Sequence, residues 1–589
     1  MSHPPAPEQH AVDTWLAQFG AALDRADHAA LAALFAEDAD WRDIVAFTWD
    51  FTSVYGPGDI ATRLIETNTE TRLRDLSPDT SRTPTSRVVR AGEEVIEGFH
   101  RFETAVGHGT GIVRLREETD GSVLATTLLT TLQELEGFEE RRGARRPHGT
   151  AYSRTFGGQN WKDLREAERE YADRDPEVLI VGGGQAGLTM AARLRAIGVD
   201  ALVIDAHGRI GDVWRKRYHS LTLHNEAWVA SLPYLEFPDT WPTYIPKDKL
   251  ADWFEFYAEA MELNTWTSTR LRGGSYDETA GQWTVELDRD GSDVTLRPRH
   301  VVMCTGSVSG KPKMPRLPGL EDFTGEVLHS SQYSSGTQYG GRQALVIGTG
   351  TSGHDVAQDL HALGSEVSIV QRNATTVVSL EPSGVSVYAL YSQGLPLEDA
   401  DLIAAGNSFR TLIKSNQLLT QKMLADDAEL LERLHAVGFR TDIGEDHTGF
   451  HLKYNRRGGG YYINVGCSDL IADGEVGLLQ HDEIERFTAE GVQLRDGTVK
   501  PLDLVVMATG YSNQQEDVRR FFGDEVADTV GPIWGVDERG EMRNMWRRTA
   551  QPGLWFHAGS LAACRMNSKY LAVQIKAELE KIAPAREEA

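Results

Sequence analysis

The chain has 589 residues and a formal net charge of −27, from 60 basic and 87 acidic side chains. The length predicts several domains, and the acidity argues against nucleic acid or an anionic membrane as a partner. The three cysteines form neither a C-x-x-C pair nor a zinc spacing, so we expect no metal site and a cytoplasmic location. No apolar run approaches about 18 residues and the N-terminus has no signal-peptide pattern, so we expect no membrane segment.

The N-terminal part of the chain predicts an α+β domain. Apolar residues recur at helical spacing over 12–23, and Asp27 is placed to cap a second helix. That second helix is expected to carry Leu31, Leu34 and Phe35. Two alternating stretches, 112–117 and 122–134, flank a turn and predict a β-hairpin. Helices followed by an antiparallel sheet are typical of the α+β class.

The opening ALAALFAEDADWRD resembles the start of the NTF2-like (SnoaL-like) cone domains, over roughly the first 150 residues. Such cones host a small ligand or serve in packing and dimerisation, so the resemblance implies either a cavity or a homodimer through this domain. Asp38, Asp43 and His100 are the polar candidates for a cavity, and a structural role is the favoured alternative. The domain and its tail span 1–160, and a charged linker helix follows at 161–176.

Residues 178–205 contain the pattern around which the rest of the chain is organised. An apolar run leads into GGGQAG at 182–187, which fits G-x-G-x-x-G, and a helical stretch and a second apolar run end at Asp205. The glycines let the backbone approach a pyrophosphate at the helix N-terminus, and the acid accepts hydrogen bonds from ribose hydroxyls. This unit predicts a dinucleotide site suited to FAD.

A second unit of the same kind follows an apolar run at 344–347. GTGTSG at 348–353 again fits G-x-G-x-x-G, but Gln371 takes the position of Asp205 and Arg372 comes next. A neutral amide does not repel a 2′-phosphate and Arg can bind one, so this unit favours NADPH. NADH stays acceptable, because we expect Gln371 to reach its ribose hydroxyls.

A fingerprint between the two units identifies a family. The residues Phe323-x-Gly325-x-x-x-His329-x-x-x-Tyr333 and the MATGY element at 507–511 resemble the flavin-containing monooxygenases, the class B flavoprotein monooxygenases. The related Baeyer–Villiger fingerprint ends in Trp, and Tyr333 departs from it. The resemblance covers residues 178–580, and three segments are most similar to the plant auxin-pathway branch. These segments are 221–246, 461–471 and 553–559. The fused N-terminal extension resembles the type II subgroup, some of which perform Baeyer–Villiger oxidations and accept both nicotinamides.

The resemblance implies a mechanism and a set of roles. NADPH reduces FAD, and O2 adds to give a C4a-(hydro)peroxyflavin that inserts one oxygen atom into a small organic substrate, as ketone Baeyer–Villiger oxidation or N/S-oxygenation. Asn225 matches, approximately, the family asparagine near the flavin edge, and His224 is the alternative after a one-residue shift. A purely structural hydrogen-bonding role is an equal alternative for either residue. His329 is expected to organise the junction between the cofactor domains, with a direct catalytic role less favoured.

The predicted architecture is therefore α/β, with two Rossmann-like dinucleotide-binding domains (FAD and NADP) preceded by an α+β NTF2-like cone domain. We expect the FAD-binding domain at 177–335 and 500–589, and the NADPH-binding domain with a helical insertion at 336–499. The catalytic candidates are Asn225, His224 and His329. The FAD-site candidates are Gly182, Gly184, Gln185, Ala186, Gly187, Asp205, Val213, Trp214, Thr222, Asn225, Gly510 and Gly559. The NADPH-site candidates are Gly348, Gly350, Thr351, Ser352, Gly353, Gln371 and Arg372.

Two other functions compete with a monooxygenase that takes a small-molecule substrate and O2. A pyridine nucleotide-dependent flavin reductase of the disulfide-reductase type wants a redox dithiol, and the missing C-x-x-C argues against it. A non-enzymatic nucleotide-binding scaffold is the other, and the intact glycine motifs and fingerprint argue against decay. The sequence therefore favours an FAD- and NADPH-dependent monooxygenase.

Overall fold

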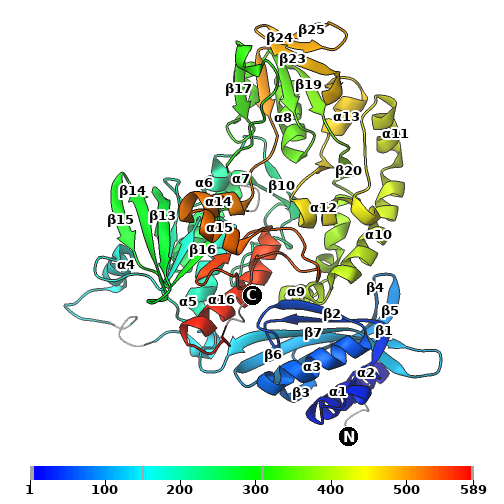
Figure 1. Cartoon of the computed structure of the whole chain (residues 1–589), viewed down its shortest axis with the longest axis vertical. Helices are drawn as coiled ribbons and strands as arrows, with labels where there is room; N and C mark the ends of the chain where they lie inside the picture. Colours follow the sequence, from blue (N-terminus) through cyan, green and yellow to red (C-terminus); the bar gives the residue numbers. More distant parts are fainter. Residues whose placement is uncertain (1–5, 149–151, 153, 307–310, 586–589) are drawn as a thin grey trace.

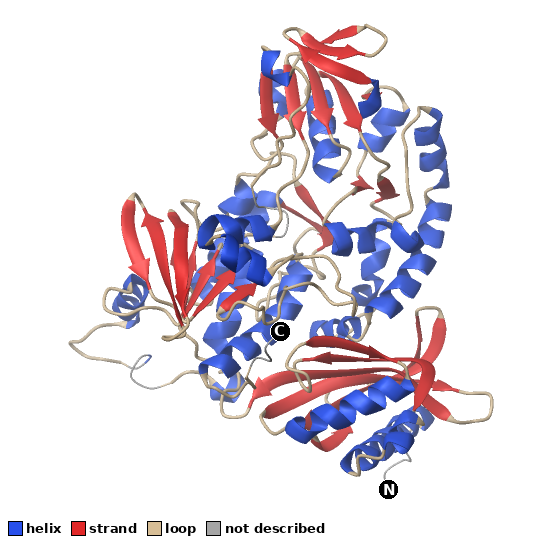
Figure 2. Ribbon diagram, in the orientation of Figure 1, coloured by secondary structure: helices blue, strands red, loops and turns tan. Residues whose placement is uncertain are grey.

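A computed structural model describes residues 6–148, 152, 154–306 and 311–585. Three regions are visible in Figure 1: an N-terminal α+β domain in blue, and two regions that are each built on a five-stranded parallel sheet. Figure 2 shows helices packed against all three sheets. Among the described helices, none is both long enough and apolar enough to cross a membrane. The α/β class with two dinucleotide-type domains is confirmed.

The N-terminal domain packs three helices on one face of a seven-stranded sheet (Figure 1). The helices are α1 (Pro7–Asp24), α2 (His28–Ala32) and α3 (Pro57–Thr71). The strands are β1 (Phe35–Ile44), β2 (Phe51–Tyr55), β3 (Arg74–Pro78), β4 (Ser86–Arg90), β5 (Glu93–Glu103), β6 (Gly107–Glu117) and β7 (Val123–Leu135), in the order β2-β1-β7-β6-β5-β3 with β4 on β5. The predicted α+β layout is confirmed, and the NTF2-like assignment stays a prediction.

The second helix ends earlier than the sequence predicts. Asp27 caps α2 through the Ala30 backbone N–H at 3.1 Å, as expected. The helix stops at Ala32, however, because the Leu34 carbonyl accepts the backbone N–H of Ala125 at 2.9 Å. This long-range sheet pairing places Phe35 in β1 and overrides the helical spacing.

The cavity candidates of this domain have structural roles. Asp43 is fully buried and accepts hydrogen bonds from the Thr130 and Thr48 hydroxyls at 2.6 and 2.7 Å. The buried His100 is hydrogen-bonded through Nε2 to the Leu129 carbonyl. Asp38 is exposed to solvent, and its carboxylate pairs with the Arg116 guanidinium at 3.1 Å. The structural alternative therefore holds for all three residues.

The first parallel sheet runs in the order β12-β9-β8-β16-β27. Its strands are β8 (Val178–Val181), β9 (Ala201–Ile204), β12 (Asn264–Trp266), β16 (His300–Met303) and β27 (Leu554–Phe556). The helices of this region include α5 (Gln185–Ala196), α6 (Asp212–Arg215), α7 (Lys247–Ala260) and α16 (Leu561–Leu579), and the linker helix α4 spans Trp161–Glu170. Two smaller sheets join it: β13 (Thr269–Asp277), β14 (Gln282–Arg289) and β15 (Ser292–Leu296), and the pair β10 (Thr222–Glu226) and β11 (Tyr244–Pro246).

The second parallel sheet runs in the order β17-β26-β18-β19-β22. Its strands are β17 (Glu326–His329), β18 (Gln343–Ile347), β19 (Glu366–Gln371), β22 (Gly477–Gln480) and β26 (Leu504–Met507), with α8 (Thr351–Ala362) after β18 and the side sheet β23 (Ile484–Thr488), β24 (Gly491–Leu494) and β25 (Val499–Pro501). The predicted boundaries placed β17 and β26 in the first domain. Because β26 pairs with both β17 and β18, these two strands belong to the second sheet.

A helical insertion connects β19 with the rest of the second region. It contains η5 (Gly384–Ser392), α9 (Leu397–Ala405), α10 (Phe409–Asp426), α11 (Ala428–Ala436) and α12 (Gly449–Arg457), followed by α13 (Cys467–Ala472), and a parallel pair β20 (Thr376–Ser379) and β21 (Tyr461–Asn464). The helix-rich stretch predicted at 397–439 is confirmed. After β26 the chain forms α14 (Gln514–Phe522) and α15 (Asp524–Val530) and returns to the first sheet at β27.

The N-terminal sheet turns its other face toward α9 and α16 (Figure 1). Arg42 forms a bidentate ion pair with the buried Glu541 at 2.7 and 2.9 Å. Arg82 pairs with Asp399 of α9 at 2.7 Å, and Arg114 donates to the Ile403 carbonyl at 3.1 Å. Asp399 and Ile403 lie on α9 of the helical insertion, and Glu541 lies between α15 and β27. The N-terminal domain therefore contacts both the insertion and the segment that returns to the first sheet.

Candidate active site

The two glycine turns have nearly the same backbone geometry. Gly182 and Gly348 both have positive φ, at 113° and 116°, and a Cβ on either would lie 2.5 or 2.4 Å from a carbonyl oxygen of the neighbouring strand's end. A Cβ on the third glycine, Gly187 or Gly353, would lie 1.8 or 1.9 Å from the carbonyl of the first. Only glycine fits these four positions.

The middle glycine of each turn faces open space. A Cβ on Gly184 would meet nothing nearer than Val213 Cγ1 at 3.7 Å, and a Cβ on Gly350 nothing nearer than the Tyr461 carbonyl at 3.9 Å. Each of these glycines is the N-cap of the following helix, and its own side chain offers no cap. The helix N–H groups and the empty approach are what a pyrophosphate requires. The residues therefore fit a dinucleotide at both turns.

The second strands of the two units end differently. Asp205 Oδ2 accepts the Gly183 N–H at 2.7 Å, and its Oδ1 accepts the His207 N–H at 2.7 Å. The carboxylate therefore lies directly beside the first glycine turn. This is the place from which an acid contacts a ribose.

Gln371 is fully buried, and its side-chain amide is hydrogen-bonded to the backbone of Arg440. Its Nε2 donates to the Arg440 carbonyl at 2.8 Å, and its Oε1 accepts the Arg440 N–H at 2.8 Å. Gln480 donates to the same oxygen at 3.1 Å. The expectation that Gln371 reaches the hydroxyls of NADH is therefore wrong for this arrangement. Gln371 instead fixes the segment at Arg440 against the end of β19.

Arg372 is exposed, directly after that buried amide. Within the described part of the chain, its guanidinium makes no ion pair, unlike Arg440, which pairs with Asp482 at 3.0 Å. Arg372 therefore pairs with no surface acid among the described residues. A planar cation without a partner at this strand end suits a 2′-phosphate.

Three FAD-site candidates form one hydrogen-bonded group. Gln185 Nε2 donates to the Gly559 carbonyl at 3.2 Å, and Gln185 Oε1 accepts the Trp214 indole N–H at 3.3 Å.

The remaining cofactor-site candidates lie at element ends. Ala186 is buried in the first turn of α5, and Thr351 and Ser352 occupy the matching turn of α8. Thr222 begins β10 and has an exposed side chain. Gly510 follows β26 and therefore lies with the second sheet rather than the first.

The fingerprint between the units is a structural connection. His329 Nδ1 accepts the Ser331 backbone N–H at 3.1 Å, so Nε2 carries the proton and donates to the Gly510 carbonyl at 3.1 Å. Burial lowers the pKa of His329. The hydroxyl of Tyr333 donates to Asp359 on α8 at 2.5 Å. These contacts connect β17 with the MATGY element and with α8, and they leave His329 no ring nitrogen for catalysis.

Asn225 and His224 are neighbours on β10, so their side chains point to opposite faces. The strand β10 packs against η5, and burial raises the pKa of Tyr388 on η5 while the nearby Asn225 side chain partly offsets that rise. Burial lowers the pKa of His224. Of the two candidates, Asn225 is the one that contacts the helical insertion.

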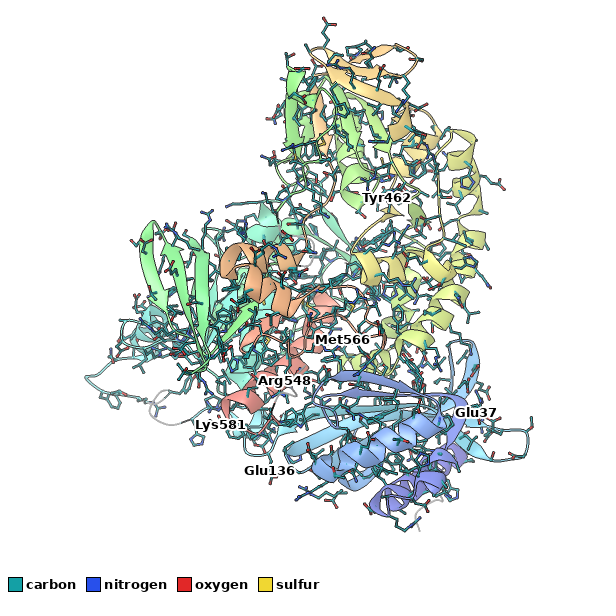
Figure 3. All side chains as sticks on the ribbon, viewed as in Figure 1. Glu37, Glu136, Tyr462, Arg548, Met566 and Lys581 are labelled. Carbon is teal, nitrogen blue, oxygen red and sulfur yellow. The ribbon has the colours of Figure 1, made fainter. Side chains whose placement is uncertain are left out.

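Sequence patterns did not predict a set of aromatic residues that lies near Gly559 of the first unit and near Gly350 of the second. We name Tyr388, Tyr454 and Tyr461 the tyrosine cluster. Burial raises the pKa of each phenol, yet each side chain keeps part of its surface accessible. Figure 3 labels Met566 on α16, whose sulfur lies 3.7 Å from the Tyr391 hydroxyl, and Tyr462, which stacks on His354. The only sequence signal was the repeated Tyr in YALY and GGGYY.

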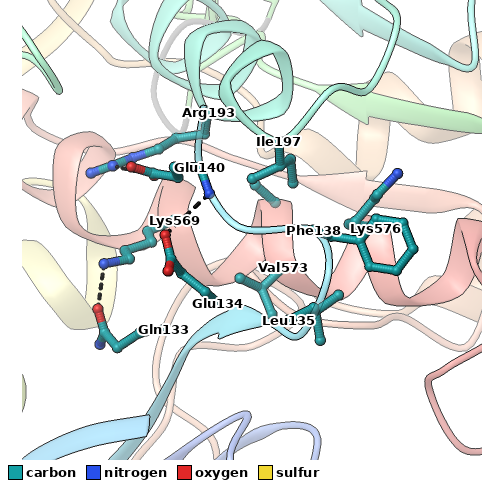
Figure 4. Close-up of a pocket in the computed structure, with 11 residues that line it drawn as sticks. Gln133, Glu134, Leu135, Phe138, Glu140, Arg193, Ile197, Lys569, Val573 and Lys576 are labelled. Atoms are coloured by element: carbon teal, nitrogen blue, oxygen red, sulfur yellow. Dashed lines mark hydrogen bonds and ion pairs between the residues drawn. The ribbon is translucent and has the colours of Figure 1, made fainter. Parts of the chain in front are cut away.

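A separate pocket lies between the N-terminal domain and α16 (Figure 4). Lys569 donates to Gln133 there, and burial and Arg193 lower the pKa of Lys569. Arg193 pairs with Glu140 at 3.1 Å and is in the last turn of α5, at the opposite end from the glycine turn. We assign this pocket to domain packing.

Comparison with known proteins agrees with this geometry. The family described as FMO-like, flavin-binding monooxygenase-like, matches residues 176–521, which is more than half of the chain. The chain belongs to this family. It is therefore an enzyme of the flavin-binding monooxygenase class, and the N-terminal α+β domain lies outside the matched residues.

Two plant relatives match this flavin monooxygenase. The indole-3-pyruvate monooxygenase YUCCA1 of Oryza sativa subsp. japonica is 31% identical over 353 residues, covering 59% of this chain and 80% of that protein. The probable indole-3-pyruvate monooxygenase YUCCA9 of Arabidopsis thaliana is 29% identical over 400 residues, covering 67% and 85%.

Two solved structures share the fold. Cyclohexanone monooxygenase with bound epsilon-caprolactone has a TM-score of 0.50 at 18% identity, covering 69% of this chain and 88% of that chain. The OTEMO complex with FAD and NADP has a TM-score of 0.50 at 17% identity, covering 70% and 86%.

Proposed function

We propose that this flavin monooxygenase uses FAD and NADPH to insert one atom of O2 into a small organic carbonyl compound. The observation that carries the proposal is the pair of glycine turns, each open at its middle glycine, of which only the first ends on an acid. The relatives support the carbonyl substrate, since their names specify indole-3-pyruvate and cyclohexanone. Heteroatom oxygenation is the other outcome that the test below reads.

The first unit is the proposed FAD site. The glycine turn and the N-terminus of α5 hold the pyrophosphate, and Asp205 accepts the ribose hydroxyls. Gln185, which accepts the Trp214 indole N–H, donates to the carbonyl of Gly559, two residues before α16. Bound flavin supplies the electrons that activate O2, and the protein excludes water from that reaction.

The second unit is the proposed NADPH site. The turn at 348–353 and the N-terminus of α8 hold the pyrophosphate, and Arg372 binds the 2′-phosphate. Gln371 contributes by holding the segment at Arg440 in place rather than by touching the coenzyme. The fingerprint residues His329 and Tyr333 keep the sheet and α8 in register with the MATGY element.

The competing reductase has no support from the cysteines. Cys304, Cys467 and Cys564 are all buried and free in the described part of the chain. Burial raises the pKa of all three thiols, so none has the thiolate character that a redox dithiol needs.

The experiment is turnover with isotopically labelled O2, NADPH and a panel of ketones, amines and sulfides, with products analysed by mass spectrometry. We expect one labelled oxygen atom in an ester or lactone from a ketone. Stoichiometric peroxide with every substrate and no labelled product would contradict the proposal.

A cytoplasmic location and a homodimer remain part of the proposal, and sedimentation of the purified chain tests the dimer.

A further inference from the structure

The chain between α15 and β27 holds two tryptophans in an unusual backbone conformation. We name residues 534–547 of this connection the tryptophan segment. Trp534 and Trp546 have φ angles of 72° and 65°, in the left-handed region. A bulky side chain is a genuine outlier there, and such a conformation persists only where surrounding contacts hold it. Contacts from outside the segment therefore have to keep it in this shape.

The two indole rings lie against both the first region and the helical insertion. Trp546 Cζ2 is 3.7 Å from the position that a Cβ of Gly559 would take. The Gly559 carbonyl accepts a hydrogen bond from Gln185, the first residue of α5, so this contact is beside the first glycine turn. The Trp534 indole donates to the Tyr454 carbonyl of α12 at 3.2 Å, and the two rings stand edge-on at 5.4 Å. The centroids of the two indoles are 6.4 Å apart.

The N-terminal domain holds the turn of the tryptophan segment. Arg42 of β1 makes a bidentate ion pair with Glu541 at 2.7 and 2.9 Å, and the Ser53 hydroxyl of β2 donates to the same carboxylate at 2.8 Å. The Glu541 side chain is only 3% exposed, and a buried carboxylate that loses its cation is strongly destabilised. The backbone of Glu541 is bonded to Asp537 across the turn at 2.8 and 2.9 Å. Arg42 therefore acts on the whole turn.

A second ion pair holds the segment next to Trp546. Asp50, directly before β2, pairs with Arg547, which follows Trp546 in the chain. Arg547 also pairs with Asp537 at 3.1 Å, so it connects this end of the segment with the turn. Within the described residues, the Asp50 carboxylate forms its ion pair with Arg547 only. The two strained tryptophans are thus followed or flanked by residues that the N-terminal domain binds.

Another ion pair of the N-terminal domain offers a matched comparison. Arg82 pairs with Asp399 of α9 at 2.7 Å, with side-chain exposures of 18% and 4%. The Arg42 and Glu541 side chains are 17% and 3% exposed, and their contact is also 2.7 Å. The two pairs therefore have the same chemistry and burial, but Arg82 holds α9 and Arg42 holds the tryptophan segment. Arg42 donates to the Ala405 carbonyl at the end of α9 as well, at 2.7 Å, so a test also needs a variant at Asp50.

We propose that the N-terminal domain is a positioning domain for the reaction, because Arg42 and Asp50 hold the tryptophan segment against the first unit. In this position the indoles of Trp534 and Trp546 form an apolar wall that keeps water away from the oxygen chemistry. The inference rests on the proposed monooxygenase function. Without such a wall, more turnover is unproductive: NADPH, a proton and O2 give NADP⁺ and hydrogen peroxide.

The first measurement is amide hydrogen exchange of the holoenzyme, read by mass spectrometry over 534–547. Arg42→Ala should speed exchange in this segment about tenfold or more, which corresponds to the loss of a charged contact. Asp50→Asn should speed it as well, and it serves alone if Arg42→Ala does not fold. Arg42→Lys keeps the charge without the bidentate contact and should fall between. Arg82→Ala should speed exchange at the start of α9 and leave 534–547 as in the wild type.

The second measurement is the rate of hydrogen peroxide release from NADPH and O2 with no substrate added. We expect this rate to rise about three- to tenfold in Arg42→Ala and in Asp50→Asn, because the wall is displaced and water enters. It should stay near the wild-type rate in Arg82→Ala. Flavin content and anaerobic reduction of the flavin by NADPH should be unchanged in all three variants.

A double-mutant cycle shows whether Arg42 acts through the indole of Trp546. Trp546→Phe shortens the wall and should itself raise peroxide release. In the double variant, the two factors should combine to less than their product, since both changes remove the same barrier to water. A residue that only stabilises the N-terminal domain would give factors that multiply independently.

Each contrary result has a distinct meaning. Unchanged exchange over 534–547 in both Arg42→Ala and Asp50→Asn overturns the holding role of the N-terminal domain. Faster exchange without more peroxide, an equal rise of peroxide in Arg82→Ala, or independent factors in the cycle overturns its role in the reaction. A wild-type protein that holds no flavin, or whose flavin NADPH does not reduce, overturns the proposed function, and the exchange data then still decide whether the domain holds the segment.

Discussion

The two glycine units are alike where the backbone must approach a phosphate and different where a side chain selects the nucleotide. Both turns begin with a glycine at positive φ. In both, the last glycine lies so close to the carbonyl oxygen of the first glycine that a Cβ would have no space. Asp205 is beside the first turn, whereas Gln371 is buried against the Arg440 backbone and leaves Arg372 exposed. One scaffold therefore holds two different cofactors by changing the end of a single strand.

The largest effect is expected from a side chain in the first open approach. Gly184→Val should abolish FAD binding, because the added methyl groups fill the space that a pyrophosphate needs. The Cβ itself has space, 3.7 Å from Val213, and the backbone at Gly184 is extended, so the protein should still fold. Flavin content of the purified variant measures the effect, with circular dichroism as the folding control. Normal flavin content would refute the assignment of the first unit.

A smaller effect is expected at the cation of the second unit. Arg372→Ala should raise the Michaelis constant for NADPH about tenfold or more, since a charged contact is worth roughly 1.5–3 kcal/mol. The constant for NADH should stay nearly unchanged. Arg433→Ala removes a cation that pairs with Asp469 and Asp473 on α13 and nearby, and it controls for the change in net charge. Equal weakening of both coenzymes would show that Arg372 does not bind the phosphate.

The acid of the first unit should have an effect of similar size on a different ligand. Asp205→Asn removes the charge that accepts the Gly183 and His207 N–H groups and the ribose hydroxyls. We expect the dissociation constant of FAD to rise about tenfold, in line with the loss of a charged hydrogen bond. Fluorescence titration of the apoprotein with FAD measures it. A change in the Michaelis constant for NADPH without a change in FAD affinity would contradict the assignment.

The smallest effect on coenzyme choice is expected at Gln371. Gln371→Glu replaces the amide that donates to the Arg440 carbonyl with a group that cannot donate when ionised. The cost should be in stability, about 1–3 kcal/mol of unfolding free energy, measured by denaturant titration. The ratio of NADPH to NADH efficiency should change less than in Arg372→Ala. A full switch to NADH would mean that residue 371 touches the ribose after all.

The glycine units could be predicted from the sequence because their geometry is local. The strand, turn, helix and acid fall within 30 residues, and their spacing alone specifies the fold of the unit. The same locality explains why the linker helix α4 and the helices of the insertion were found. His329 was predicted to organise the junction between the cofactor domains, whereas its contact with Gly510 and that of Tyr333 with Asp359 lie within the second region.

Features that depend on distant partners could not be predicted. Gln371 and Arg440 are far apart in sequence, so the hydrogen bonds between the Gln371 amide and the Arg440 backbone could not be predicted without the fold. The membership of β17 and β26 in the second sheet likewise depends on their pairing across the insertion. The tyrosine cluster comes from η5, α12 and β21, and only the packing of the insertion on the first region brings it beside Asn225.

The central claim is that the second glycine turn holds the nicotinamide coenzyme and the first holds the flavin. Gly350→Val tests it most directly, because the Cβ has space, 3.9 Å from the Tyr461 carbonyl, and the backbone at Gly350 is extended. The measurement is the flavin content of the purified variant together with anaerobic reduction of that flavin by NADPH and by dithionite. The account predicts normal flavin content, reduction by dithionite, and no reduction by NADPH. Loss of the flavin, or reduction by NADPH at the wild-type rate, would contradict it.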